Sequence, residues 1–206
     1  QNKVRQAVFV ALQWAVDMDM LPYHPGAGVK RVREGRSERP IFELAELNKL
    51  FAAPWDDARA YAAALLAATT GARLGEVRGL LIRNAHPEER YIDIVTNWVD
   101  SEGMKAPKWG SERIGVPIPD VTATALEAVL KVNPYREDPD AFVFFTPHAK
   151  TQPVDTSVIT KGLQKRMREL GLRGGRSFHC FRHTYVSHLR GKLPEAKLVR
   201  MVGHTN

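Results

Sequence analysis

The sequence predicts a mainly α-helical protein that contains one small antiparallel β-sheet, an α+β fold. In several segments the apolar residues recur every three to four positions, which is the period of a helix that buries one face. Two short segments, residues 91–95 and 113–117, are instead rich in β-forming residues and flank a turn-rich stretch. We expect these two segments to pair as antiparallel strands within an otherwise helical domain.

The N-terminal segment predicts a single helix. Val4, Val8 and Leu12 follow helical spacing, so residues 3–19 are expected to form one amphipathic helix. An N-cap residue usually precedes the first turn of a helix, but this sequence begins without one. We therefore interpret residues 1–21 as the last helix of an upstream domain.

A polar segment separates this helix from the rest of the chain. Prolines and glycines interrupt regular structure after the helix, and residues 30–40 are polar and basic. We interpret residues 22–40 as an interdomain linker. The main domain is expected to occupy residues 41–206.

The main domain begins with two predicted helices. Leucines at helical spacing predict the first at residues 44–51, and the second, at residues 58–70, is rich in alanine, whose small side chain permits close packing. Asp120 and Ser177 are expected to be N-caps of later helices, and residues 142–145 form an apolar run that we expect to be buried. The further helices are predicted at residues 120–131, 155–170, 177–188 and 194–203.

Composition narrows the class of protein. Of the 206 residues, 44% are hydrophobic and 26% are charged, which is enough apolar material for one main domain and a smaller piece. No apolar run approaches the roughly 20 residues of a membrane span, and the start of the chain lacks the pattern of a secretory signal. The single cysteine, Cys180, excludes an internal disulfide and a multi-cysteine zinc site. We therefore expect a cytoplasmic protein.

The basic charge of the chain is localised. The net charge is +7, with a pI near 9.7. Between Lys161 and Arg200 there are eleven lysines or arginines against two acids, so this stretch carries +9 and the remainder of the chain −2. Solvated helices usually interleave both signs of charge. The imbalance favours a polyanionic partner such as a nucleic acid.

One candidate motif combines histidine and arginine on a predicted helix. His179 and Arg182 are three residues apart and therefore share a helix face. Taken alone, the pair also fits a surface histidine and a solvated arginine. Tyr185 belongs to a different, apolar stripe with Phe178 and Phe181, so we interpret it as a core residue rather than a nucleophile.

Three more motifs carry candidate residues. In Thr70–Glu76 an arginine, Arg73, follows a glycine and stands at the start of a helix, where backbone NH groups and a guanidinium can converge on an anion. Lys108 lies in the turn before the second predicted strand, and His204 follows Gly203 at the end of the last helix. Each of the three, taken singly, also fits a structural role.

Together and in this order, the motifs resemble the catalytic domain of the tyrosine recombinase (phage integrase) family, over about residues 40–206. Valine at position 202, where the family has leucine, is a mild departure. Lys105 is an alternative to Lys108, which fits the family's spacing better. The matched boxes are T-G-x-R-x-G-E at Thr70–Glu76, a hairpin lysine at Lys108 followed by Arg113 and Pro117, H-x-x-R-H-T at His179–Thr184, and L-G-H at Val202–His204.

The resemblance implies site-specific DNA cleavage and rejoining without a metal or cofactor. It assigns Arg73 and Arg182 to the scissile phosphate, which His204 would also contact, and makes Lys108 the general acid for the leaving 5′ oxygen. His179 would assist proton transfer at the nucleophile. Glu76 would orient neighbouring cations.

The family's nucleophile is a tyrosine about nine residues beyond the last histidine. The sequence ends at Asn206, so we assign no nucleophile within it, and we expect a catalytic domain that is incomplete at its C-terminus and inactive by itself.

The resemblance also implies partners. We expect double-stranded DNA, a homo-tetramer on synapsed sites and a monomer when free, with accessory DNA-bending or directionality proteins, in a bacterial or phage-encoded, nucleoid-associated protein of a mobile element. The residues expected to contact the DNA backbone are Arg31, Arg33, Arg36, Lys161, Lys165, Arg166 and Arg176.

Three alternatives remain open. One is a DNA-binding module of the same fold without catalysis. A second is a metal site formed by His179, His183 and His204, which would leave the arginines and Lys108 unexplained. A third is DNA relaxation rather than recombination, because type IB topoisomerases share the fold.

Overall fold

The protein divides into two units in its computed structural model, Gln1–Glu38 and Arg39–Asn206. Each unit has its own internal contacts and is described by itself. The structure describes residues 2–32, 40–107, 111–194, 197 and 201.

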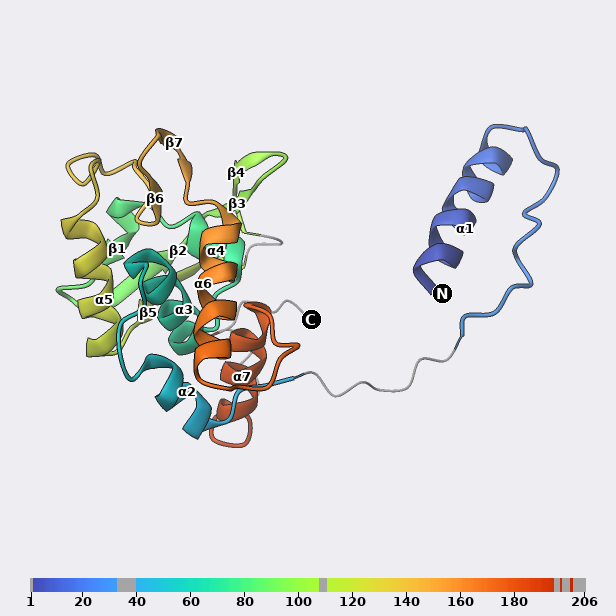
Figure 1. The fold of residues 1–206 in the computed structure, drawn as a ribbon. Helices are drawn as coiled ribbons and strands as arrows, with labels where there is room; N and C mark the ends of the chain where they lie inside the picture. Colours follow the sequence, from blue (N-terminus) through green and yellow to red (C-terminus); the bar gives the residue numbers. More distant parts are fainter. Residues whose placement is uncertain (1, 33–39, 108–110, 195–196, 198–200, 202–206) are drawn as a thin grey trace. The chain divides into compact units, whose positions relative to one another are not determined.

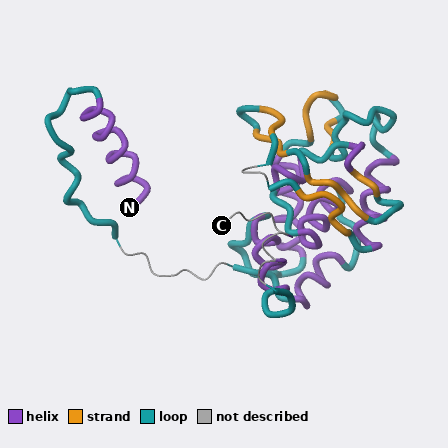
Figure 2. The backbone as a smooth tube through the Cα atoms, turned by 180° about the vertical axis from the view of Figure 1, so that it is seen from behind, coloured by secondary structure: helices purple, strands orange, loops and turns teal. Residues whose placement is uncertain are grey.

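The first unit consists of helix α1, Asn2–Asp17, and a chain segment that runs back beside it (Figures 1 and 2). Arg5 Nε donates a hydrogen bond of 2.8 Å to the carbonyl of Val29. The ring of His24 lies 3.9 Å from that of Phe9, and its Nε2 is 3.0 Å from the Phe9 carbonyl oxygen. Residues 22–32 of the segment that we interpreted as a linker are therefore held on α1.

The predicted N-terminal helix is confirmed, but its apolar side chains are not buried within this unit. No residue of α1 is buried. Val4 is 69% exposed, Val8 53% and Trp14 57%. These side chains present an apolar face to the surface of the unit.

The described residues of the second unit form six helices and contain the buried core. Helix α3 occupies its centre and packs against α5, α6 and α7 (Figure 1). The helices are α2 at Leu44–Phe51, α3 at Ala58–Thr70, α4 at Leu74–Arg78, α5 at Asp120–Lys131, α6 at Thr156–Glu169 and α7 at His179–Leu189.

Small side chains explain the central place of α3. Ala60, Ala63 and Ala64 are fully buried. A Cβ atom on Gly162 of α6 would lie 2.8 Å from the Cβ of Ala60, so glycine at this position lets the two helices pack more closely than a larger residue would. The alanine-rich sequence thus permits three helices to pack against one.

The two predicted strands pair as expected. β2, Tyr91–Ile94, and β5, Arg113–Pro117, are antiparallel, with Ile92 opposite Val116. A short strand β1, Ala85–His86, which follows the 3-10 turn at Ile82–Asn84, completes a three-stranded sheet in the order β1-β2-β5.

The described residues form two further hairpins, which the sequence did not predict. The turn-rich stretch between the two predicted strands contains β3, Asn97–Val99, and β4, Gly103–Lys105. The apolar run near residue 145 leads into β6, Phe145–Thr146, which pairs with β7, Ala149–Pro153. The prediction of one small sheet therefore understated the β content.

The helix starts differ in part from those expected. Asp155 is the N-cap of α6, and its side chain accepts a hydrogen bond of 2.7 Å from the NH of Ser157. Asp120 instead lies inside the first turn of α5, whose N-cap is Pro119. Helix α7 begins at His179 after Phe178, so Ser177 is not its cap. Most of the helix expected at residues 194–203 lies outside the described residues.

Within the described parts of the chain, every helix is too short or too polar to traverse a lipid bilayer.

Candidate active site

The junction between α3 and α4 places Arg73. Gly71 ends α3 in the left-handed conformation, with φ of 67°. A Cβ at this position would lie 2.7 Å from Cδ1 of Tyr185, so glycine satisfies both the backbone angle and the contact. The tight turn that results makes Arg73 the N-cap residue of α4.

Glu76 is a buried carboxylate shared by two arginines. Its Oε2 accepts the backbone NH of Arg73 at 2.9 Å, and its Oε1 lies 2.6 Å from Arg73 Nη1. The same Oε2 is 2.7 Å from Nη2 of Arg113, which reaches it from β5. The expectation that Glu76 orients neighbouring cations accordingly has a geometric basis.

Helix α7 brings a third guanidinium to the same turn. Arg182 is 3% exposed, and its Nη1 donates a hydrogen bond of 2.8 Å to the carbonyl of Gly71. His179, at the first position of α7, is exposed, and its ring lies 4.5 Å from that of His183 in a perpendicular arrangement. The predicted common face of His179 and Arg182 therefore faces the Arg73 turn.

The segment around Phe42, at the start of the second unit, is bonded to α7. The NH of Phe42 donates a hydrogen bond of 2.8 Å to Oγ1 of Thr184, and the Phe42 ring stacks on Phe181 at 4.9 Å. The guanidinium of Arg176 lies over the same Phe42 ring at 4.9 Å. This contact fixes Ile41, the preceding residue, at the rim of the site.

A cavity of about 520 Å³ opens between these elements. Three of the five residues expected to be catalytic, Arg73, His179 and Arg182, line it together. The other lining residues are Ile41, His183, Val186, Ser187 and Arg190. The cavity therefore combines three arginines with two histidines and suits a small anion.

Among the described residues of this cluster, the positive charges outnumber the negative. Arg73 and Arg113 form ion pairs with Glu76, and the Glu76 carboxylate also attracts Arg182 electrostatically. Burial, together with repulsion from Arg73 and Arg113, lowers the pKa of Arg182 to about 10, against the attraction of Glu76. Arg182 still carries its charge at neutral pH. An anion bound in the cavity would relieve the repulsion, as expected of a phosphate site.

Two predicted catalytic residues, Lys108 and His204, lie outside the described residues. The alternative lysine, Lys105, ends strand β4, is exposed and forms an ion pair with Glu102. Met201, three residues before His204, accepts a hydrogen bond of 3.0 Å from Nη1 of Arg113. Lys108 and His204 therefore stay predictions.

Arg113 is the residue whose role the sequence did not reveal. In the sequence, Arg113 was only part of the R-x-x-x-P spacing that favoured Lys108. The available signal was an arginine within a predicted strand, and an arginine that is buried needs a carboxylate or carbonyl partner. Its partners are 37 or more residues away in sequence, so local patterns do not show them.

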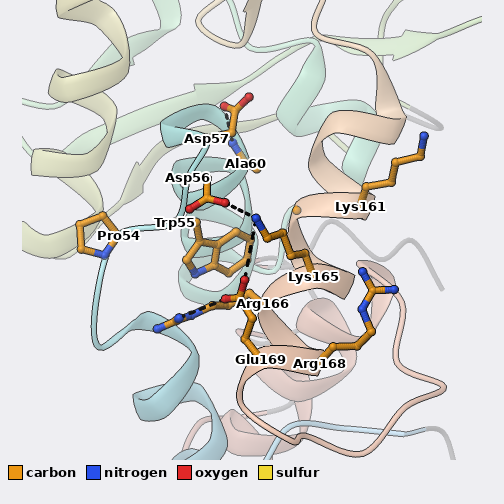
Figure 3. A pocket seen from close by; sticks show the side chains of 11 residues that line it. Pro54, Trp55, Asp56, Asp57, Ala60, Lys161, Lys165, Arg166, Arg168 and Glu169 are labelled. Carbon is orange, nitrogen blue, oxygen red and sulfur yellow. Dashed lines mark hydrogen bonds and ion pairs between the residues drawn. The ribbon is translucent and has the colours of Figure 1, made fainter.

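The basic residues of α6 line a second hollow, which Figure 3 shows from close by. Lys161, Lys165 and Arg166 face a loop that contains Trp55 and Asp56. Lys165 is ion-paired with Asp56, and Arg166 Nη1 lies 3.4 Å from Glu169. Part of the basic charge counted in the sequence is thus balanced by neighbouring acids. Of the linker arginines, Arg31 is exposed, and Arg33 and Arg36 lie outside the described residues.

Arg176, which we expected to contact the DNA backbone, is only 8% exposed. Its Nη1 lies 2.8 Å from Oε1 of Glu46 and its guanidinium covers Phe42. A guanidinium with these contacts has little surface left for a phosphate, so Arg176 belongs to the core that supports α2 and α7.

Metal binding finds no support in the described part of the chain. Within it, no group of three or more His, Cys, Asp or Glu side chains is arranged to hold a metal ion. His204, the third ligand of the proposed histidine site, lies outside this part.

Comparison with known proteins identifies relatives over most of the chain. A model of the phage integrase family matches residues 41–206. The chain is 27% identical to a tyrosine recombinase XerC of Yersinia pestis, over 95% of this chain and 61% of the relative. A XerC of Serratia marcescens is 26% identical with the same coverage. The chain thus spans about three fifths of the length of these relatives.

Solved structures of low sequence identity have the same fold. An integrase of the transposon Tn1549, in complex with a circular intermediate DNA, has a TM-score of 0.76 at 19% identity, covering 100% of this chain and 71% of that one. A lambda integrase tetramer bound to a Holliday junction has a TM-score of 0.67 at 15% identity, covering 98% of this chain and 57% of that one. The α+β fold predicted from the sequence is confirmed.

Proposed function

This chain belongs to the phage integrase family, and we propose that it cleaves and rejoins DNA at specific sites through a covalent 3′-phosphotyrosyl intermediate. The observation that carries the proposal is the convergence of Arg73 and Arg182 on one cavity that also contains His179. Attack on a phosphodiester builds negative charge on the non-bridging oxygens, and fixed guanidinium groups stabilise that charge.

Each remaining step has a candidate group. His179, at the exposed start of α7, assists proton transfer at the nucleophile. Lys108 donates the proton that the departing 5′ oxygen requires, and His204 adds a hydrogen bond to the phosphate. A tyrosine outside residues 1–206 supplies the nucleophile, so the fragment by itself does not cleave DNA. The arginines supply the positive field, so this mechanism calls for no metal.

The proposed substrate is double-stranded DNA, bound by a tetramer at paired sites and by a monomer before synapsis. The Tn1549 and lambda integrases, whose structures contain DNA, support this partner. Integration or excision of a mobile element, in the cytoplasm at the nucleoid and with accessory directionality proteins, is the role that we infer. Lys161, Lys165 and Arg166 on α6 and the linker residues Arg31, Arg33 and Arg36 are proposed to hold the DNA backbone.

Covalent trapping tests the proposal. A chain extended beyond residue 206 is incubated with nicked duplexes prepared from genomic fragments, and protein–DNA adducts are recovered after denaturation in detergent. The wild-type chain should yield adducts, and Arg73→Ala or Arg182→Ala should lower the yield by about 100-fold or more, the size expected for loss of a transition-state contact. Arg83→Ala is the control, because Arg83 is an exposed residue paired with Asp140.

The same assay separates the alternatives. DNA binding without any adduct in the extended chain would favour a DNA-binding module without catalysis. Adducts that form equally well in both cavity variants would overturn the assignment of Arg73 and Arg182.

A further inference from the structure

Arg113 holds a position from which it can control the charge of the proposed phosphate site. Its side chain is 4% exposed and that of Glu76 is 2% exposed, whereas that of Arg73 is 36% exposed. The carboxylate is therefore enclosed between one buried and one accessible guanidinium. We propose that Arg113 is a positioning residue of the reaction, which neutralises Glu76 so that the charge of Arg73 stays available to a phosphate. This inference rests on the proposed function.

The charges of the cluster support this role. A buried carboxylate needs a compensating cation, because its desolvation is costly. Without Arg113, Arg73 would be the counter-ion of Glu76 on α4, and their pair would carry no net charge toward the cavity. With Arg113 present, the group of three carries one net positive charge, and the exposed member is Arg73.

Arg113 also fixes the turn on which the site is built. Its Nη1 donates hydrogen bonds of 3.0 Å to the carbonyls of Thr70 and Met201. Arg182 Nη1 donates a hydrogen bond of 2.8 Å to the next carbonyl, that of Gly71. Two buried guanidiniums thus bond to consecutive carbonyls of the turn that leads to Arg73. Arg113 also bonds to Met201, three residues before His204 in the sequence.

A double-mutant cycle separates charge compensation from simple structural support. In the extended, active chain, Arg113→Gln should slow DNA cleavage in a single turnover by about 30- to 100-fold, with the DNA dissociation constant within about threefold of wild type. In the Glu76→Gln background, Arg113→Gln should lower the cleavage rate by at most about threefold, because there is then no carboxylate to neutralise. Arg113→Lys, which retains the cation, should stay within about tenfold of wild type.

Arg59→Gln is the matched control. Arg59 is a partly buried arginine that pairs with Asp57 at 2.7 Å, at the end of α3 remote from Thr70. The Arg59→Gln substitution should lower thermal stability without slowing DNA cleavage by the folded protein. All rates are compared at equal folded fraction, determined by circular dichroism and thermal unfolding.

Four results would contradict the proposed role of Arg113 or the proposed function. Equal losses from Arg113→Gln in the wild-type and Glu76→Gln backgrounds, in folded protein, would overturn the proposal. If Arg113→Gln does not fold, Arg113→Lys decides: folded protein that cleaves more than about tenfold slower than wild type contradicts charge compensation. Failure of the wild-type chain to cleave would contradict the proposed function itself, whereas wild-type cleavage with no effect at Arg113 contradicts only this inference.

Discussion

Arg182 is buried among like charges, and this predicts that an anion stabilises the fold. Burial and the nearby Arg73 lower its pKa from the ordinary arginine value to about 10, so the charged form is less favourable in the folded than in the unfolded chain. The charged Arg182 therefore destabilises the fold to its full extent at neutral pH, and this destabilisation disappears as the pH rises through about 10. A sulfate or phosphate ion in the cavity would offset the cost.

Thermal unfolding of residues 1–206 checks this prediction. At ten times its dissociation constant, sulfate should raise the free energy of unfolding by about 1.4 kcal/mol relative to chloride of equal ionic strength. Arg182→Gln should abolish the difference. An equal effect of sulfate on wild type and variant would place the anion elsewhere.

The candidate residues differ in how far the sequence revealed them. Arg73, His179 and Arg182 were assigned through the resemblance of several motifs, taken together, to one family, and the structure places all three on one cavity. Helix periodicity explains why the two on α7 face the same cavity. Arg113 was missed because its role depends on Glu76 and Met201, which only the folded chain brings to it.

At the scale of elements, the N-cap of α3 predicts a stability that depends on pH. Asp57 accepts hydrogen bonds from the NH groups of Arg59 and Ala60, at 2.9 and 3.4 Å. Burial raises the pKa of Asp57, but hydrogen bonds and the charge of Arg59 outweigh it, and the net pKa is below the ordinary 3.8. A lowered pKa stabilises the fold above pH 3.8, and this contribution is lost as the pH falls below it.

Urea unfolding measures this contribution. At pH 7, Asp57→Ala should lower the free energy of unfolding by about 1 kcal/mol, whereas Asp57→Asn, which keeps an oxygen acceptor, should lower it less. The difference between wild type and Asp57→Ala should shrink at pH 3. A difference that grows in acid would contradict the sign of the pKa change.

Elements were predicted best where one pattern repeats over several turns. The helices α2, α3 and α6 agree with the sequence to within one residue, apart from their caps. The β3–β4 hairpin was missed because strands of three residues give too few alternations to detect. Its place depends on tertiary contact: a Cβ on Gly75 of α4 would lie 2.8 Å from the carbonyl oxygen of Trp98.

At the scale of the whole molecule, the basic charge divides into structural and available parts. Arg176 is buried against Glu46, whereas Lys161 is exposed on α6. The sequence could not separate them, because a count of charges does not show which acids fold against which bases. We expect the two residues to respond differently to substitution.

Salt titration of DNA binding tests this division. Lys161→Gln should reduce the slope of log affinity against log salt by about 0.9, as expected for one lost phosphate contact. Arg176→Gln should leave that slope unchanged and lower the free energy of unfolding by about 1.5 kcal/mol, because the charge-assisted contact with the partly exposed Glu46 is lost. A reduced slope for folded Arg176→Gln would restore Arg176 to the DNA-binding set.

The hydrogen bonds of Arg113 also determine when, during folding, the proposed active site can form. Its partners Glu76, Thr70 and Met201 are 37, 43 and 88 residues away in sequence. A polypeptide in which residues 70–76, 113 and 201 have not yet come together lacks the contacts that hold the Arg73 turn. Under the proposed function, competence to cleave DNA would therefore arise only late in folding.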